Sequence, residues 1–263
     1  AQRAVLLARQ AGLDEQIATR KQALAADRQA WELELAKRAS EAPEWHVLEV
    51  ESFSSAGGAS HELLEDQSIL VSGKRPSQDT YTVTLRSDVE QISGLKLETL
   101  THESLPGMGP GRHIEERPNF VLHELTVEAG PAQDEAGLEK VTLHTAEADF
   151  SQQNWSVKGI IDGDSKTGWG INPQFGKPHF ATVLAEETFG GASWKIVVRL
   201  EQNLGECRTI GRLRISAMTG TPSGQVPDAV LAILKKPAAK RTDKQQATLD
   251  EHFFSQDPMV KSL

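Results

Sequence analysis

The sequence predicts a mainly β protein, an antiparallel β-sandwich with a long N-terminal helix before it and two short C-terminal helices after it. Three observations support this fold class. Apolar and polar residues alternate from Trp45 to about Thr219, as they do in half-buried strands. Glycine and proline clusters interrupt the alternation at short intervals, which is typical of the turns in sandwiches. On both sides of this region the apolar spacing changes to the period of a helix.

Residues 1–42 are expected to form a coiled-coil-like N-terminal helical segment. Proline is absent between Ala1 and about Arg38, and Gly12 is expected to divide a short leading segment from a long helix. Apolar residues at steps of four and seven form one stripe along this helix: Leu13, Ile17, Leu24, Trp31 and Leu35. Because the other faces are charged, we expect the stripe to pack on a second helix or on the body of the protein.

The middle of the chain runs twice through one order of elements. The clearest alternating stretches are 81–85, 95–100, 121–127, 194–200 and 213–216. In each half, a strand is followed by a turn that contains aspartate, at 66–73 and at 162–169. This echo predicts a first β-sandwich unit over 43–130 and a second over 131–222, and one larger double-layered sandwich also fits the pattern.

Residues 223–263 are expected to form a C-terminal helical segment that packs near the N-terminal helix. Val230, Leu231 and Leu234 make an apolar helix face that ends before Pro237. A second helix is predicted to follow Thr242, because Thr242 and Gln245 have the spacing of a capping box. Helices that meet at the two ends of a chain suit a domain inserted into a longer polypeptide.

The charge balance and the cysteine content exclude several function classes. Of 263 residues, 28 are Lys or Arg and 37 are Asp or Glu, so the net charge is -9 and no nucleic-acid partner is expected. No apolar run reaches the roughly 20 residues of a membrane span. The lone Cys207 rules out an internal disulfide framework, a four-cysteine zinc site and a haem-attachment motif. No export leader follows Ala1, so such a signal is expected to have been removed or to lie outside this sequence.

No pattern typical of catalysis is present, so we do not expect an enzyme. The loop at 105–112 is rich in glycine and proline but lacks the Gly-Lys-Ser/Thr of a phosphate-binding loop. The histidines have no spacing typical of a catalytic zinc, and the sequence contains no Gly-x-Ser-x-Gly.

The turn at 162–169 carries the most specific chemical pattern. Asp162 and Asp164 flank Gly163, and the hydroxyl of Thr167 follows three residues later. Carboxylate, hydroxyl and backbone oxygens in such a turn can surround one hard cation, and Ca²⁺ takes about six to eight oxygen ligands. The same residues also fit a plain Asx-type turn between two strands, with no ion.

Tryptophans on both sides of this turn favour a sugar-binding platform. Aromatic faces stack on the apolar faces of pyranose rings, and neighbouring polar side chains then orient the hydroxyl groups. The candidate ligand-binding residues are Trp155, Trp169, Asn172, His179 and Arg112. The alternative is that each tryptophan only packs in the core, and an aromatic content of 5% weakens the case for a dedicated sugar binder.

Several stretches, in this order along the chain, resemble one protein family: 66–73 with Asp79-Thr80-Tyr81, 95–97 with 105–112, 119–124, 148–152 with 161–164 and 167–169, and 210–214. They are similar to a segment of large exported planctomycete proteins of uncharacterised function that begin with a cytochrome c module. In that family the segment resembles galactose-binding-like sandwiches of the discoidin or coagulation factor type C kind, which are jelly rolls. The haem module itself is absent from this sequence.

The resemblance implies an exported protein, periplasmic or extracellular, whose partners are a glycan or extracellular polymer and the neighbouring domains of the parent chain. Discoidin-like modules often hold a structural calcium at such a turn, and Glu124 is expected to join Asp162, Asp164 and Thr167 as a ligand because 119–127 resembles their closing strand. The expected function is a non-catalytic carbohydrate-recognition module with no haem. The alternative is a structural spacer that positions neighbouring domains without a ligand of its own.

Overall fold

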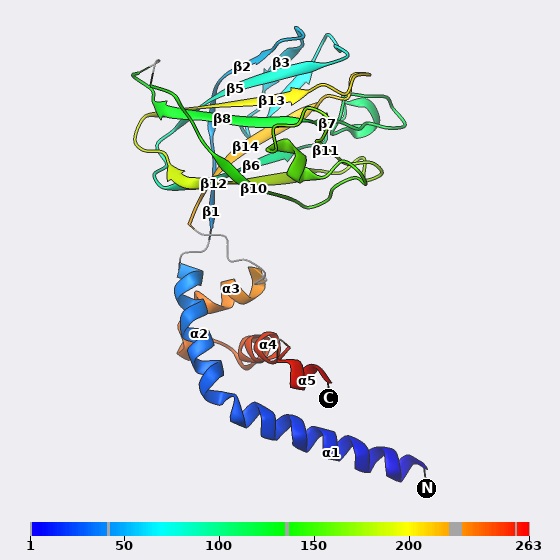
Figure 1. Ribbon diagram of the computed structural model, residues 1–263, viewed down its shortest axis with the longest axis vertical. Helices are drawn as coiled ribbons and strands as arrows, with labels where there is room; N and C mark the ends of the chain where they lie inside the picture. The colour runs from blue at the N-terminus through cyan, green and yellow to red at the C-terminus, as the bar shows by residue number, and fades with distance from the viewer. Residues whose placement is uncertain (1, 41–42, 135–136, 221–227, 256, 263) are drawn as a thin grey trace. The chain divides into compact units, whose positions relative to one another are not determined.

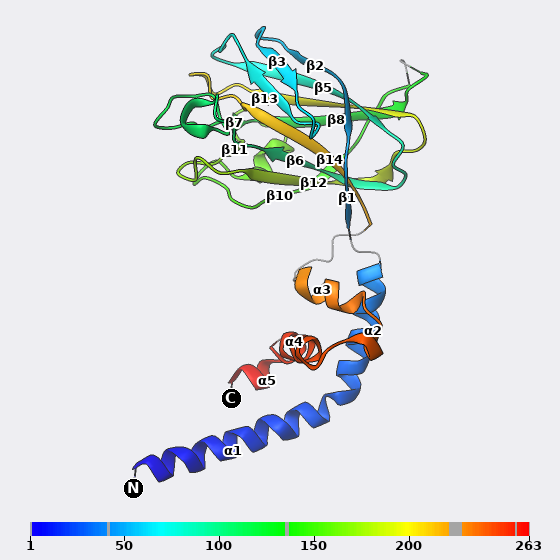
Figure 2. The ribbon, with the colours of Figure 1, turned by 180° about the vertical axis from the view of Figure 1, so that it is seen from behind.

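The chain forms two compact units (Figures 1 and 2). The computed structural model describes residues 2–40, 43–134, 137–220, 228–255 and 257–262. One unit is a β-sandwich from Glu44 to Gly220. The other consists of helices from both ends of the chain, within Ala1–Pro43 and Thr221–Leu263.

The sandwich has two antiparallel sheets and a two-stranded ribbon. Among the described residues the first sheet contains β1 (Glu44–Val47), β3 (Ser60–Leu63), β4 (Ile69–Ser72), β6 (Ile92–Thr99), β10 (Leu143–Ala148), β12 (His179–Phe189) and β14 (Arg212–Thr219). The second contains β2 (Glu49–Ser55), β5 (Asp79–Ser87), β8 (Glu124–Pro131), β9 (Glu139–Lys140) and β13 (Trp194–Gln202). The ribbon pairs β7 (Val121–Leu122) with β11 (Trp169–Gly170). The prediction of a mainly β, antiparallel sandwich is confirmed.

Strands from both halves of the sequence pair within each sheet. The first sheet has the order β10-β12-β6-β14-β4-β3, with β1 on β14, and the second has the order β2-β5-β13-β8-β9. Strand β6 therefore lies between β12 and β14, and β13 lies between β5 and β8. The expected units at 43–130 and 131–222 do not correspond to two bodies, because neither range contains a complete sheet. The alternation alone could not separate the two arrangements, since it is the same in one large sandwich and in two small ones.

The core lies between the two sheets, and burial follows the predicted period of two. On β5 the side chains of Tyr81, Val83 and Leu85 are fully buried, while the residues between them are partly exposed. Other buried residues of this core come from strands of both sheets: Leu95, Leu97, Val127, Ile196, Val198, Leu200, Ile215 and Ala217. Every second residue of the central strands thus contributes to one shared interior.

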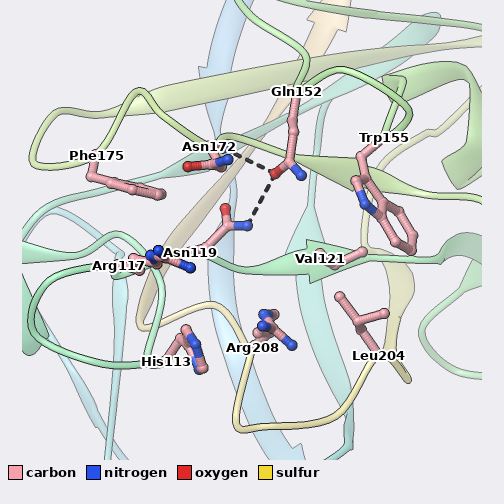
Figure 3. A pocket seen from close by; sticks show the side chains of 10 residues that line it. All are labelled: His113, Arg117, Asn119, Val121, Gln152, Trp155, Asn172, Phe175, Leu204 and Arg208. Carbon is pink, nitrogen blue, oxygen red and sulfur yellow. Dashed lines mark hydrogen bonds between the residues drawn. The ribbon is translucent and has the colours of Figure 1, made fainter.

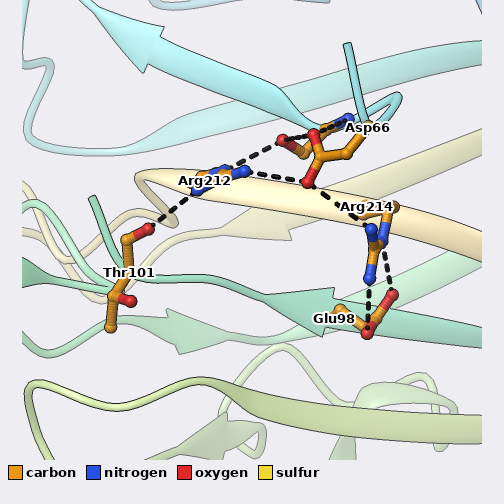
Figure 4. Close-up of polar contacts among 6 residues, drawn as sticks. Asp66, Glu98, Thr101, Arg212 and Arg214 are labelled. Carbon is orange, nitrogen blue, oxygen red and sulfur yellow. Dashed lines mark hydrogen bonds and ion pairs between the residues drawn. The ribbon is translucent and has the colours of Figure 1, made fainter. Parts of the chain in front are cut away.

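A polar network ties the turn before β4 to the middle of the first sheet (Figure 4). Arg214 binds Glu98 on β6 through two parallel contacts of 2.8 and 3.1 Å, and Arg212 contacts Asp66 at 2.9 Å. Burial alone would raise the pKa of Asp66. Hydrogen bonds from Ser68 and the charges of Arg212 and Arg214 outweigh that effect and lower the pKa below its usual value. The first of the two aspartate-bearing turns is therefore a structural tie within the sandwich.

The helical unit contains α1 (Gln2–Ala23), α2 (Ala25–Ser40), α3 (Asp228–Leu234), α4 (Asp243–Phe254) and α5 (Pro258–Ser262). Helix α1 runs through Gly12, and the interruption lies at Leu24, where α2 begins one residue later. Gly12 is tolerated because an isolated glycine costs a helix only about 1 kcal/mol. The capping box expected at Thr242 and Gln245 is present at the start of α4.

Helices from the two ends of the chain share one small core. Its buried members are Leu35, Val230, Leu231, Ile233, Leu234 and Leu249, with Trp31 packed against them. Arg28 on α2 also contacts Asp250 on α4 at 2.9 Å. Of the expected N-terminal stripe, Leu35 is buried and the other four residues are half-buried. No described helix has both the length and the apolar character needed to cross a membrane.

Candidate functional site

A pocket of about 400 Å³ lies beside the β7–β11 ribbon (Figure 3). Its walls come from four stretches of chain: the segment leading into β7, the loop after β10, the loop after β11 and the loop between β13 and β14. The lining residues are His113, Arg117, Asn119, Val121, Gln152, Trp155, Asn172, Phe175, Leu204 and Arg208. Loops carried on a rigid scaffold are a common location for binding residues.

Two amide side chains in this pocket, those of Gln152 and Asn119, are held by hydrogen bonds to one another and to the backbone. Oε1 of Gln152 accepts from Nδ2 of Asn119 and from the backbone N–H of Asn172, both at 3.1 Å (Figure 3). Oδ1 of Asn119 accepts from the backbone N–H of Ile171 at 3.2 Å. These contacts fix which end of each amide is oxygen, so Nε2 of Gln152 is left as a donor.

Gly170 on β11 makes room for this arrangement. A Cβ atom at that position would lie 2.9 Å from Oε1 of Gln152 and 3.4 Å from Cβ of Trp155. Because both residues line the pocket, any side chain at 170 would displace part of the wall.

Two aromatic rings flank the amides. Phe175 and Trp155 lie on opposite sides of them in Figure 3, and both side chains are half-buried. Trp155 meets His123 edge-on, with 5.6 Å between ring centroids and an interplanar angle of 81°. Nδ1 of His123 accepts from the backbone N–H of Asn203 at 2.9 Å, and burial lowers the pKa of His123. His123 is therefore neutral and hydrogen-bonded, and its ring packs against Trp155 on the side away from the pocket.

The remaining wall is cationic. Arg117, Arg208 and His113 lie on the side of the pocket away from Gln152 (Figure 3). Nδ1 of His113 donates to the backbone carbonyl of Glu206 at 2.6 Å. Arg208 pairs with the carboxylate of Glu206 at 2.6 Å, and that glutamate is 66% exposed. None of the ten described lining residues is Asp or Glu.

Two of the five sequence-predicted ligand residues, Trp155 and Asn172, line this pocket. The structure places Trp169 elsewhere: it is fully buried, its Nε1–H donates to the carbonyl of Phe150 at 2.8 Å, and its ring meets Phe120 edge-on. The packing alternative therefore describes Trp169, because a ring with no exposed surface cannot stack on a ligand.

His179 and Arg112 are also buried instead of facing a ligand. The two ring nitrogens of His179 lie 2.7 Å from Oδ2 of Asp149 and 2.6 Å from the carbonyl oxygen of Gln174, so neither is left for a sugar. Arg112 is 3% exposed and donates to the backbone carbonyls of residues 72–74. Both side chains hold loops together, which explains why polar residues occur at these buried positions.

The other pocket residues were not identified from the sequence. Arg117, Asn119, Gln152, Phe175 and Arg208 come from four stretches of chain that are far apart in the sequence and share no spacing pattern. The density of glycine and proline around them indicates loops without telling which loops meet.

The turn predicted to bind calcium has the geometry of an Asx-type turn. Oδ1 of Asp162 accepts from the backbone N–H of Asp164 at 2.9 Å, and Oδ1 of Asp164 accepts from that of Lys166 at 3.0 Å. Oγ1 of Thr167 lies 3.0 and 2.9 Å from the two carboxylate oxygens of Asp162 and 3.0 Å from the carbonyl of Asp164. The carboxylate of Asp162, the hydroxyl of Thr167 and the backbone carbonyl of Asp164 therefore lie together, whereas the carboxylate of Asp164 is turned to the N–H of Lys166.

The fourth predicted ligand, Glu124, begins β8 and faces the same turn. Its Oε1 is buried without a hydrogen-bond partner. Burial raises the pKa of Glu124, and the negative charge of Asp162 raises it further. In the part of the chain that the structure describes, no three His, Cys, Asp or Glu side chains converge to hold a metal ion. An ion here would take its remaining ligands from Thr167, backbone carbonyls or water.

No protein-family model matches the sequence, and no curated protein matches it. Among solved structures, the chain is similar to one containing the CBM32-1, CBM32-2 and M60 catalytic domains of Clostridium perfringens ZmpB, with 6% identity and a TM-score of 0.33 over 84% of this chain. The chain spans 22% of the length of that structure.

Two further similarities are to single modules. TmCBM27, described as recognising mannan, has 9% identity and a TM-score of 0.27, with 67% of this chain and 86% of that one covered. The xylan-binding module CBM86 of Roseburia intestinalis has 13% identity and a TM-score of 0.18, with 61% and 96% covered. Similarities this low assign neither a family nor a ligand, so the function has to be argued from the geometry of the pocket.

Proposed function

We propose that the sandwich is a non-catalytic carbohydrate-recognition module and that the pocket beside β7 and β11 binds the sugar. The observation that carries this proposal is the combination of Trp155 and Phe175 with two oriented amides, Gln152 and Asn119, in one pocket of about 400 Å³. Small-molecule sites are typically apolar hollows of about 300–1,000 Å³ with a few fixed polar groups.

The aromatic rings and the amide groups of the pocket match the two kinds of surface on a sugar. A pyranose ring has an apolar face of C–H groups, which packs against an aromatic ring. Its edge carries hydroxyl groups, each of which both donates and accepts hydrogen bonds. Gln152 and Asn172 offer amide groups at that edge, and the hydrogen bonds of Gln152 hold its side chain in place before a ligand arrives.

The lining residues support binding without hydrolysis. Glycosidases use two carboxyl groups, about 5–9.5 Å apart, on either side of the bond that they cleave. The ten described residues of this pocket include no carboxylate, so they offer neither a general acid nor a nucleophile of that kind.

A structural calcium at the Asp162 turn is part of the proposal. Two observations support it: the orphaned Oε1 of Glu124, and the raised pKa that Glu124 owes to burial and to the charge of Asp162. Two carboxylates that face each other repel, and a divalent cation between them would relieve this. The ion would join β8 to the turn and would take no part in contacting the sugar.

The chain is proposed to act outside the cytoplasm as part of a longer protein, with a glycan or extracellular polymer as its partner. This part of the proposal follows from the resemblance of stretches such as 105–112 and 119–124 to exported multidomain proteins.

A second proposal concerns the helical unit, which would act as a spacer towards neighbouring domains. It is favoured by the pairing of the first and last strands, Glu44 with Thr219, and by the core that α2, α3 and α4 share. In a Leu249→Ala variant, the backbone amides of these helices are expected to exchange hydrogen faster, while the amides of the sandwich keep their protection from exchange. Equal loss of protection in both units would contradict a separate spacer.

The sugar-binding proposal is tested by titrating the whole chain against a panel of soluble polysaccharides. We expect binding to at least one, and we expect Trp155→Ala to weaken it by about 10-fold or more, because stacking area is lost. Trp45, exposed on β1 outside the pocket, supplies the control: Trp45→Ala should bind as the native chain does. Binding that survives Trp155→Ala, or that Trp45→Ala weakens equally, would contradict the assignment of the pocket.

A further inference from the structure

The lining of the pocket differs in charge from the rest of the molecule. The chain as a whole carries a net charge of -9. The pocket has two guanidinium groups, Arg117 and Arg208, the imidazole of His113 and no carboxylate among its ten described residues. An acidic protein with a locally cationic pocket repels anions in general and attracts them at one place.

The hydrogen-bonding groups in the pocket are also unevenly divided. The side-chain oxygens of Gln152 and Asn119 already accept backbone or amide N–H groups. The side chain of Asn172 keeps one amide oxygen as an acceptor, but the other groups that remain, the Nε2 of Gln152 and the guanidinium groups, are donors, and a guanidinium has five N–H groups and no acceptor. A neutral hydroxyl would use such donors only in part, whereas an ionised oxyacid consists of acceptors alone.

Arg117 is the strongest single indication. Its side chain is exposed, and among the described residues it forms no ion pair and no side-chain hydrogen bond. Its guanidinium can therefore turn towards a ligand without breaking an existing contact, and its planar fork fits two oxygens of a carboxylate or a sulfate.

The guanidinium group of Arg208 forms only a weak ion pair. Its partner Glu206 is 66% exposed, so solvent weakens the pair, and Glu206 is not a lining residue. An anionic group in the pocket would share Arg208 with Glu206 or replace it. The Glu206 carboxylate then acts as a competitor of the ligand.

We propose that this pocket selects sugars that carry an ionised oxyacid group, a carboxylate or a sulfate ester, which is bound by Arg117 and Arg208 while the ring packs against Trp155. The inference rests on the proposed sugar-binding function and adds the chemical class of the sugar. The carboxylate and the sulfate share charge and acceptor oxygens, so the experiment separates them.

The test is calorimetric titration of the whole chain with matched pairs of oligosaccharides. One pair is galacturonate oligomers against neutral galactose oligomers of the same linkage, and the other is sulfated carrageenan oligomers against the same oligomers after removal of the sulfate. We expect the charged member of at least one pair to bind about 10- to 100-fold more tightly, because charge-assisted hydrogen bonds are strong. The pair that shows the difference identifies the group.

Variants separate the pocket from the general charge of the protein. Arg117→Ala should remove most of the preference for the charged sugar, so that the ratio of the charged to the neutral affinity falls towards 1. The matched control is Arg199→Ala, since Arg199 is exposed on β13 and outside the pocket lining. Glu206→Gln should strengthen binding of the charged sugar, because it removes the competing carboxylate.

Three results would count against the proposal in different ways. Equal affinity for both members of each pair, lost in Trp155→Ala, would overturn the charge preference and leave sugar binding intact. A preference that Arg199→Ala reduces as much as Arg117→Ala would also overturn it, because it would then reflect overall charge. No binding of any charged or neutral oligosaccharide would overturn both the inference and the proposed function.

Discussion

His123 and Trp155 meet edge to face, with 5.6 Å between their ring centroids, and this contact joins the interior of the sandwich to the wall of the pocket. His123 is 2% exposed and its Nδ1 accepts the backbone N–H of Asn203. The histidine is therefore fixed on one side by the β13–β14 loop and fixes the tryptophan on the other. The position of the aromatic wall depends on a residue that no ligand touches.

Replacing His123 by alanine is expected to impair both stability and binding. The lost ring leaves a cavity behind Trp155, and the N–H of Asn203 loses its acceptor. Urea unfolding should show a loss of about 2–4 kcal/mol. Sugar affinity should fall under conditions in which the variant is still folded. Native affinity in the folded variant would show that other contacts hold Trp155.

The stability of the sandwich is expected to fall as pH drops below the unfolded pKa of histidine, 6.5. Burial lowers the pKa of His123 in the folded state, so between the two values the unfolded chain binds more protons. The stabilising contribution of the neutral ring is present above pH 6.5 and is lost as pH falls towards the folded pKa. Unfolding curves between pH 7.5 and 5 check this, with His123→Phe as the comparison. An equally steep decline in His123→Phe would assign the effect to other groups.

Glu124→Gln provides a test of the calcium proposal. Burial raises the pKa of Glu124 in the folded state above its value in the unfolded chain. At low pH, where the carboxyl group is protonated in both states, it does not oppose folding. As pH rises through the folded pKa the group ionises, and its buried charge then lowers the stability of the fold. Without calcium, Glu124→Gln should therefore raise the melting temperature at pH 7. With added Ca²⁺ the native chain should gain stability and the variant should gain less. No stabilisation of the native chain by millimolar Ca²⁺ would remove the ion from the account.

Substitution of Trp169 is expected to reduce stability but not sugar binding, and substitution of Trp155 is expected to reduce sugar binding more than stability. Trp169→Phe removes the hydrogen bond to the carbonyl of Phe150 and leaves a gap in a fully buried site. It should cost about 2–4 kcal/mol of unfolding free energy and leave sugar affinity unchanged. Trp155→Ala should weaken binding with a smaller effect on stability. Loss of binding in a folded Trp169→Phe would return Trp169 to the list of ligand residues.

Gly170→Ala should reduce affinity while the protein stays folded. The added Cβ would lie 2.9 Å from Oε1 of Gln152, the end of a flexible side chain that can move aside at little cost. Once displaced, Gln152 no longer presents its Nε2 in the same place. Gly12→Ala, in a helix with nothing within 4 Å of the new Cβ, is the control and should not affect binding. Full affinity in Gly170→Ala would show that Gln152 does not contact the sugar.

The sequence was sufficient for the layers of the sandwich but not for the topology. Alternation predicts that Tyr81, Val83 and Leu85 face inward, and they do. Strand β5 pairs with β2 of its own half on one side and with β13, more than a hundred residues later, on the other. The second pairing depends on long-range packing, which a local pattern does not contain.

The site was predictable only where local spacing carries the information. Asp162, Asp164 and Thr167 are close in the sequence and do meet in one turn. Among the aromatic candidates, Trp155 and Trp169 look alike in the sequence, yet only Trp155 lines the pocket. The difference arises because Trp169 belongs to the ribbon with β7 and its buried ring packs edge-on against Phe120. Burial of that kind is decided by distant segments.

A crystal structure of the whole chain with a bound oligosaccharide from the titrations tests the central claim most directly. We expect a sugar ring packed on Trp155, hydroxyl groups within hydrogen-bond distance of Gln152 and Asn172, and any acidic substituent beside Arg117. A ring bound on the open face of either sheet, or at the Asp162 turn with the pocket beside β7 and β11 empty, would contradict it.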